Sequence, residues 1–185
     1  MKFNFDVVVV GAGIGGLYIS YLLGKSGLKV GLIDAKADIT NVSFNTLGSF
    51  LDLEHFGFSQ KIVAAKETEL YFHSAHTHFV KRGHSYILNK KILYQEILKM
   101  IPKDKVKIYL ATRITDCSLG KKGEAVAVKD DQGHLYQARI FIDATGIVGL
   151  LSRKFGLQDK KLTVGSGIEF NVQYKDPQYR CHLFI

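Results

Sequence analysis

The sequence GAGIGG at residues 11–16 is the feature that most constrains the fold of this chain. It follows a continuous apolar run, Phe5–Val10, which is typical of a strand buried on both faces of a parallel sheet. Apolar residues then recur at helical spacing as far as Gly27, a suitable C-terminal cap, and residues 29–33 form a second apolar run. Strand, glycine turn, helix and strand in this order predict a right-handed βαβ unit.

Each glycine of the motif has a physical role in a nucleotide-binding turn. Gly11 permits the tight turn, Gly13 lets the backbone approach a pyrophosphate, and Gly16 allows the helix to pack closely on the sheet. The N–H groups and dipole at the helix start favour a diphosphate. Asp34 ends the second apolar run, where a carboxylate can bind a ribose 2′-OH and repel a 2′-phosphate. The motif therefore predicts an adenine dinucleotide, either NAD or FAD, with a ligand-free tight turn as the alternative.

The remaining pattern predicts further strands and helices with weaker signals at first. Between residues 35 and 60 we expect loops around one short helix at 50–56, and Asn89 is a suitable N-cap for a helix over 89–101. Glycine and aspartate turns separate an alternating β-meander. The expected strands are a hairpin at 67–73 and 77–81, a strand at 105–110, a meander at 114–119, 124–129 and 134–138, a strand at 139–143, and strands at 162–174 and 179–185.

Charge and composition exclude several classes of protein. The net charge of +8 comes from lysines scattered along the chain without long basic runs, so we expect no nucleic-acid partner. The longest uncharged run, residues 7–24, carries the glycine motif in its middle and follows Asp6, so it divides into a strand and a helix rather than spanning a membrane. Cys117 and Cys181 form no CxxC pair, which favours a reducing, cytoplasmic location.

A second strand–turn–helix pattern, IFIDATGIVGLLSRKFG at residues 140–156, repeats the order of the first. Together, DVVVVGAGIGGLYISYLLGKSGLKVGLIDAK and IFIDATG after a meander resemble the two fingerprints of two-dinucleotide-binding-domain flavoproteins. GIVGLLSRKFG and YILNKKILYQEILKMI are similar to the geranylgeranyl reductase branch of that superfamily, which is related to aromatic-ring monooxygenases. The resemblance covers residues 3–156, and GSGIEFNV resembles the first strand of the family's substrate domain. Of the two dinucleotides left open by the first motif, NAD and FAD, the resemblance implies FAD.

The resemblance implies an α/β fold: a Rossmann-like FAD/NAD(P)-binding domain with a parallel sheet, a β-meander crossover and the start of an antiparallel substrate-domain sheet. It implies a domain over residues 1–161, in which a hairpin insertion at about 67–88 belongs to the substrate side, and the first strands of a truncated substrate domain over 162–185. Position by position, it implies cofactor contacts at Gly11, Gly13, Ile14, Gly15, Gly16, Asp34, Ala35, Lys36, Lys90, Ile114, Asp143, Ala144 and Gly146. Lys90 stands where the family typically has arginine, so it keeps the charge without the planar fork.

The expected function is that of an FAD-dependent oxidoreductase that acts on an apolar small-molecule substrate by flavin hydride transfer. An isoprenoid is the candidate substrate, and NAD(P)H is a candidate electron donor. The alternatives are a flavin monooxygenase and a truncated, non-catalytic dinucleotide-binding module. Residues 45–48 lack the family's Arg-Cys-Gly segment, and the family's later Gly-Asp segment is absent. We therefore expect the AMP half of FAD to be held and much of the isoalloxazine site to be missing, as in a fragment, a truncated chain or a degenerate member.

Other constellations give weaker signals. His76 and His78 would share a strand face, but no cysteine or carboxylate cluster accompanies them, so we expect no metal site. The serines and histidines show no nucleophile-elbow pattern. The positive charge could steer an anionic partner such as a prenyl diphosphate or bring the protein to an anionic lipid surface. The sequence names neither the substrate, the catalytic acid or base, nor the oligomeric state.

Overall fold

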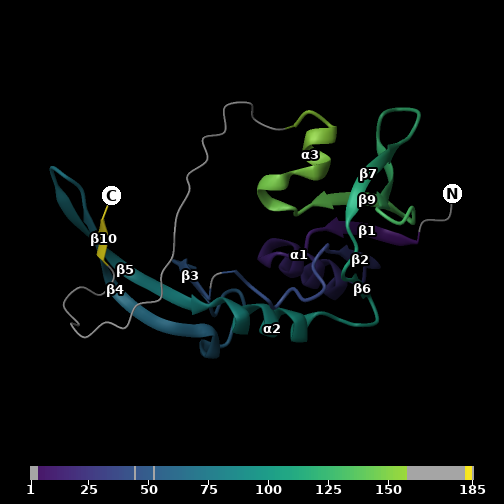
Figure 1. Ribbon diagram of the computed structural model, residues 1–185. Helices are drawn as coiled ribbons and strands as arrows, with labels where there is room; N and C mark the ends of the chain where they lie inside the picture. The colour runs from purple at the N-terminus through teal and green to yellow at the C-terminus, as the bar shows by residue number, and fades with distance from the viewer. Residues whose placement is uncertain (1–3, 44, 52, 158–181, 185) are drawn as a thin grey trace. The chain divides into compact units, whose positions relative to one another are not determined.

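A computed structural model describes residues 4–43, 45–51, 53–157 and 182–184, and these residues divide into two units (Figure 1). The first unit comprises residues 4–41 and 94–157. The second comprises the described residues between 42 and 93 together with 182–184. Each unit is built on a sheet of its own.

The sheet of the first unit has the strand order β6-β2-β1-β9-β8-β7. Its centre is parallel: β1 (Phe5–Val10) pairs with β2 (Val30–Ile33) and β9 (Leu135–Asp143), and β2 pairs with β6 (Val106–Tyr109). The strands β7 (Ile114–Leu119) and β8 (Ala125–Asp130) add an antiparallel meander to β9. The predicted α/β class, parallel sheet and meander crossover are confirmed.

Helix α1 (Ile14–Lys25) packs on β1 and β2, as the glycine spacing requires. A Cβ atom at Gly16 would collide with the carbonyl oxygen of Gly11, and a Cβ at Gly24 would meet Pro102 and Val106. The helix is followed by Gly27 with φ +92°, in the left-handed region that favours glycine after a helix. Small residues thus allow α1 to lie close to the sheet.

The other face of the sheet carries an apolar core under the meander. The helix α3 (Leu150–Lys154), preceded by the 3₁₀ turn η2 (Gly146–Val148), closes this core. The buried members of the core are Val8, Val10, Ile33, Ile114, Cys117, Val128, Ala138 and Leu151. Because Leu151 of α3 is part of this core, the core also holds the turn after β9, which is the second predicted fingerprint.

The second unit is a four-stranded sheet with the order β10-β4-β5-β3. Its long hairpin consists of β4 (Val63–His73), entered by the 3₁₀ turn η1 (Gln60–Ile62), and β5 (His78–Asn89). The edge strands are β3 (Thr46–Ser49) and β10 (His182–Phe184). After β5 comes α2 (Lys90–Met100), whose residues from Tyr94 onward belong to the first unit; the Asn89 side chain accepts from Ile92 N at 3.0 Å, as predicted for an N-cap.

Three predicted elements differ from the structure. The described residues of 50–56 form no helix. The strand β3 ends at Ser49, and residues 53–58 form a turn in which Gly57 N donates to Glu54 O and Phe58 N donates to Leu53 O. The hairpin strands are longer than predicted. The predicted strands 134–138 and 139–143 are one strand, β9, because residues 135–137 pair with β8 and the following residues pair with β1.

Part of the predicted C-terminal structure lies outside the described residues. The expected strand at 162–174 is in this part, and of the expected strand at 179–185 only β10 is described, pairing in parallel with β4. Among the described residues, no helix combines the length and the apolar character needed to cross a bilayer.

Candidate dinucleotide-binding site

The glycine turn after β1 lies directly against the turn after β9. Gly11 has φ +103°, and its N–H donates to Ile33 O at 2.7 Å. Ala144 N donates to Val10 O at 2.8 Å, and a Cβ atom added to Gly11 would collide with the carbonyl oxygen of Ala144. Gly11 is therefore required by the chain's own packing: the two fingerprints touch, and only glycine fits between them.

Gly13 differs from Gly11 and Gly16 because nothing in the described part of the chain requires a glycine there. Its backbone has φ −64° and ψ 178°, which any residue adopts, and a Cβ atom at this position would meet no atom within 4 Å. Open space beside an unstrained glycine fits a position that a ligand backbone or phosphate approaches closely. Gly15, in the first turn of α1, likewise has no neighbour within 4 Å of a Cβ.

The first turn of α1 is suited to an anion. Its N-cap is Gly13, which has no side chain to cap the helix, and the turn contains no acidic residue. The first N–H groups of a helix have no partner within the helix and carry the positive end of its dipole. A diphosphate placed over Gly13 would therefore meet the N–H donors of a helix turn that has no carboxylate of its own.

A cavity of about 510 Å³ lies over the glycine turn, within the first unit. It is formed where the parallel strands β1, β2 and β9 end, the edge at which open α/β sheets bind ligands. Eight predicted site residues line it: Gly11, Gly13, Asp34, Ala35, Lys36, Ile114, Ala144 and Gly146.

The other predicted residues lie elsewhere. Ile14, Gly15 and Gly16 begin α1 next to the cavity without lining it, and Asp143 is behind the second turn. Lys90 belongs to the second unit and is not among the residues that line the cavity, so its predicted cofactor contact stays a prediction.

Asp34 joins the first glycine turn to the turn after β2. Its Oδ2 accepts the N–H of Ala12 at 2.6 Å and its Oδ1 accepts the N–H of Lys36 at 2.8 Å. The side chain is half-buried and lines the cavity, so each oxygen can still accept a second hydrogen bond from a ligand hydroxyl. One carboxylate thus both fixes the wall of the cavity and offers a ribose-binding group.

The segment after β6 completes the wall and carries residues that the sequence pattern missed. Ala111 N donates to Lys36 O and Thr112 N donates to Asp34 O, both at 2.9 Å. Thr112 and Arg113 therefore line the cavity beside the predicted Ile114. No short motif marks these two residues, because hydrogen bonds to a segment far away in sequence bring them here.

Tyr94 of α2 is another lining residue that the sequence did not reveal. Burial raises the pKa of its phenol, a hydrogen bond involving the Ile14 backbone opposes this, and the charge of Asp34 adds to the increase. The phenol thus stays protonated at neutral pH between the start of α1 and Asp34. In the sequence, Tyr94 stands at the spacing of an ordinary core residue of the helix, so the pattern gave no sign that it lines the cavity.

Asp143 supports the second turn from behind. Its Oδ1 accepts from the N–H and hydroxyl of Thr145 at 3.1 and 2.6 Å, and its Oδ2 accepts the N–H groups of Leu151 and Ser152 at 2.8 and 2.9 Å. Burial acts to raise the pKa of Asp143, but these hydrogen bonds outweigh it and the pKa lies below its ordinary value. The carboxylate therefore holds the turn that faces Gly11.

These features fit the adenosine diphosphate portion of a dinucleotide. The cavity offers open space beside Gly13 for phosphate, the carboxylate of Asp34 for ribose, and an apolar lining residue, Ile114. Lys36 and Arg113 are exposed at its rim and supply positive charge for an anionic ligand.

The histidines of the hairpin lie in the second unit. His73 and His78 are direct cross-strand neighbours with ring centroids 6.2 Å apart, whereas His76 is in the turn and does not share their face as the alternation had suggested. In the described part of the chain, no three or more histidine, cysteine, aspartate or glutamate side chains come together as a metal site would require.

Comparison with known proteins finds a family model and a curated relative that match most of the chain. The model of the family described as lycopene cyclase protein matches residues 6–178. A digeranylgeranylglycerophospholipid reductase of Methanococcus vannielii is 28% identical over 165 residues, which cover 85% of this chain and 42% of the relative.

Solved structures share the fold at lower identity. A geranylgeranyl bacteriochlorophyll reductase-like protein of Thermoplasma acidophilum has a TM-score of 0.72 at 18% identity, covering 86% of this chain and 43% of its own. PqsL of Pseudomonas aeruginosa, a probable FAD-dependent monooxygenase, has a TM-score of 0.69 at 20% identity, covering 85% and 46%. The chain thus spans less than half the length of each of these relatives.

Proposed function

Because this chain belongs to the lycopene cyclase protein family, we propose that its glycine-lined cavity binds FAD and that the protein contributes the FAD-binding part of an oxidoreductase. The observation that carries the proposal is Gly13. The described residues give no steric or conformational reason for glycine at this position, and the open space beside it belongs to a cavity with a ribose-binding carboxylate. A ligand that approaches the backbone closely supplies the reason.

The residues of the first unit would bind the adenosine diphosphate half of the cofactor. Gly13 and the first turn of α1 would receive the diphosphate, Asp34 the adenosine ribose, and Ile114 the adenine. When bound, FAD would supply hydride transfer, while the protein positions it and sets its electrostatics. The described residues offer no group that we assign as a catalytic acid or base.

For the substrate we propose an isoprenoid. Lycopene and digeranylgeranylglycerophospholipid, named in the family and in the Methanococcus relative, are both built on polyisoprenoid chains. The second unit has apolar surface of the kind such a chain requires: Phe72 stacks on Phe79 with ring centroids 4.6 Å apart, and Phe79 is 53% exposed. Burial of such side chains against a hydrocarbon would supply the binding energy.

The cofactor proposal is tested by adding FAD, NAD and ADP separately to the purified protein. We expect FAD to bind with the absorbance band of oxidised flavin and ADP to compete with it, since the cavity recognises their shared part. NAD should bind to the protein more weakly than FAD does. Failure of both FAD and ADP to bind would overturn the proposal, and binding of ADP without FAD would favour a non-catalytic nucleotide-binding module.

The reaction type is tested on the flavin-loaded protein with NAD(P)H as the proposed electron donor. Anaerobic reduction of an isoprenoid alkene is the expected result. Hydroxylation of the substrate that depends on oxygen would instead identify a monooxygenase, the activity that the description of PqsL names for that protein.

We also propose that the protein binds to the surface of anionic lipid membranes. Lys81 lies over the ring of Phe50, which is 63% exposed, so a cation and an aromatic side chain share one surface of the second unit. Such a pair suits the boundary between lipid headgroups and acyl chains. Sedimentation with phosphatidylserine vesicles should exceed that with phosphatidylcholine vesicles and should fall in high salt; equal sedimentation would count against the partnership.

A further inference from the structure

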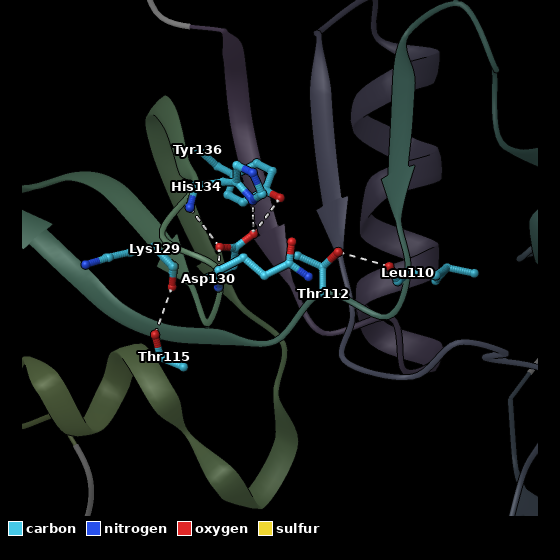
Figure 2. Close-up of polar contacts among 8 residues, drawn as sticks. Leu110, Thr112, Thr115, Lys129, Asp130, His134 and Tyr136 are labelled. Carbon is cyan, nitrogen blue, oxygen red and sulfur yellow. Dashed lines mark hydrogen bonds and ion pairs between the residues drawn. The ribbon is translucent and has the colours of Figure 1, made fainter.

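Behind the wall of the cavity, the carboxylate of Asp130 collects four hydrogen bonds (Figure 2). Its Oδ1 accepts the N–H groups of Gln132 and His134 at 3.0 and 2.8 Å. Its Oδ2 contacts His134 Nδ1 at 3.0 Å and accepts the Tyr136 hydroxyl at 3.1 Å. The Asp130 side chain is 4% exposed. We call Asp130, Gln132, His134 and Tyr136 the Asp130 hub.

The hub is joined to the cavity wall at two points. The N–H of Asp131, inside the hub's turn, donates to the carbonyl oxygen of Arg113 at 2.9 Å. Asp130 is also the ladder partner of Ile114 where β7 pairs with β8, and Ile114 lines the cavity. Thr112 and Arg113 both line the cavity, whereas Asp130, His134 and Tyr136 do not. The hub therefore acts on a ligand through residues of the cavity lining such as Arg113 and Ile114, and not by direct contact.

The wall itself contains a strained residue. Ala111 has φ +49°, and among the described residues it is the only one other than glycine with a positive φ. For an L-residue this conformation is disfavoured about ten-fold or more, and it persists only where the surroundings fix it. Ala111 N donates to Lys36 O, and Thr112 N donates to Asp34 O. The strain thus lies at the point where the wall joins the ribose-binding turn.

We propose that the Asp130 hub is a positioning element for the adenosine end of the cavity: it holds Ala111 in the left-handed conformation and so presents Thr112 and Arg113 to the nucleotide. The inference rests on the proposed function, because the positioned residues serve the same cavity. Its distinguishing feature is the strained alanine. A hub that merely stabilised its own turn would have no influence on how easily residue 111 adopts positive φ.

The test uses Tyr136→Phe, which removes the hydroxyl that donates to Asp130 Oδ2 at 3.1 Å, alone and together with Ala111→Gly. Titration calorimetry gives the affinity for ADP, and denaturant unfolding gives stability. Tyr136→Phe should weaken ADP binding about five-fold, the effect of one net hydrogen bond. Ala111→Gly should restore the affinity to within about two-fold, because glycine adopts positive φ without support.

Thr115→Val is the matched control. It removes a hydroxyl that bonds Lys129 O at 3.4 Å on the neighbouring strand, away from the cavity lining, so ADP affinity should not change. Unchanged affinity in Tyr136→Phe, or a loss that Ala111→Gly does not recover, would overturn the inference.

Hydrogen exchange of the Thr112 amide separates this inference from the proposed function. If the parent protein binds no ADP, the proposed function fails, but the hub is still tested: faster exchange at Thr112 in Tyr136→Phe, slowed again by Ala111→Gly, supports positioning. Unaltered exchange at Thr112 would overturn it whether or not ADP binds.

Discussion

The carboxylate of Asp143 is expected to hold the second turn in place, and Asp143→Asn tests this. The substitution keeps the size of the side chain and one acceptor oxygen for Thr145. The amide NH₂ would then face the N–H groups of Leu151 and Ser152, which now donate to Oδ2 at 2.8 and 2.9 Å. Two donors at the start of α3 would lose their acceptor.

The expected loss of stability is about 1–2 kcal/mol. Loss of a side chain that caps the start of a helix typically costs about 1 kcal/mol, and hydrogen bonds to a charged acceptor are at the strong end of the range. Partial exposure of Asp143 to solvent weakens the effect, which keeps the estimate at the lower end for two such bonds. In a chain of this length the melting temperature should fall by roughly 3–6 °C.

The effect should depend on pH in a definite direction. The pKa of Asp143 is lowered in the folded protein, so the carboxylate contributes stability above the pKa of an unfolded aspartate, about 3.9, and loses it as pH falls through the lower folded value. Asparagine does not titrate. The difference in unfolding free energy between the parent protein and Asp143→Asn should therefore be full at pH 7 and shrink below pH 4.

Denaturant unfolding monitored by circular dichroism at several pH values measures this difference. Asp104→Asn is the control. The Asp104 side chain is exposed, and its Oδ2 lies 3.8 Å from Lys105 Nζ in a surface ion pair, which contributes little to stability. This substitution should change the free energy of unfolding by less than about 0.5 kcal/mol. If Asp143→Asn is as mild as Asp104→Asn, or if its effect grows at low pH, the assigned role of Asp143 is wrong.

Two further predictions concern buried positions. Gly16→Ala should destabilise the protein by about 2–3 kcal/mol, because the new Cβ collides with Gly11 O, whereas the neighbouring Gly15→Ala meets open space in a helix and should stabilise it by about 0.5–1 kcal/mol. Urea unfolding compares the pair, and equal effects would contradict the packing argument. Burial raises the pKa of the Cys117 thiol, so alkylation of Cys117 by iodoacetamide, followed by peptide mass spectrometry, should be slow until urea unfolds the protein; rapid labelling of the native protein would contradict this.

The first βαβ unit could be predicted closely from the sequence because its signals are local. The apolar run of β1, the glycine turn and the left-handed Gly27 each specify their own conformation. Residues 50–56 were predicted wrongly because their apolar side chains suggested a helix face, yet Phe50 and Leu51 are exposed and the chain turns. The division of β9 was predicted wrongly because the strand changes partner at Ala138, and periodicity does not report a change of partner.

The candidate site shows the same division between local and distant causes. Gly11, Gly13 and Asp34 stand at positions that a motif specifies, and the structure brings them to one cavity. Thr112 and Arg113 reach it only because the segment after β6 bonds to the turn after β2, a tertiary event without a sequence signature. The strain at Ala111 could not be predicted either, because alanine is ordinary in composition and unusual only in its φ angle.

The most direct test of the nucleotide-binding account is the ADP affinity of Gly13→Val. Among the described residues, apart from the chain neighbours, no atom lies within 4 Å of a Cβ at Gly13, so the variant should fold while its side chain fills the space expected for the diphosphate. Gly48→Val, at another open glycine but in β3 of the second unit, is the control and should bind as the parent protein does. We predict that calorimetry will show at least a roughly ten-fold loss of ADP affinity for Gly13→Val alone, about 1.4 kcal/mol. Equal affinity in all three proteins would contradict the account.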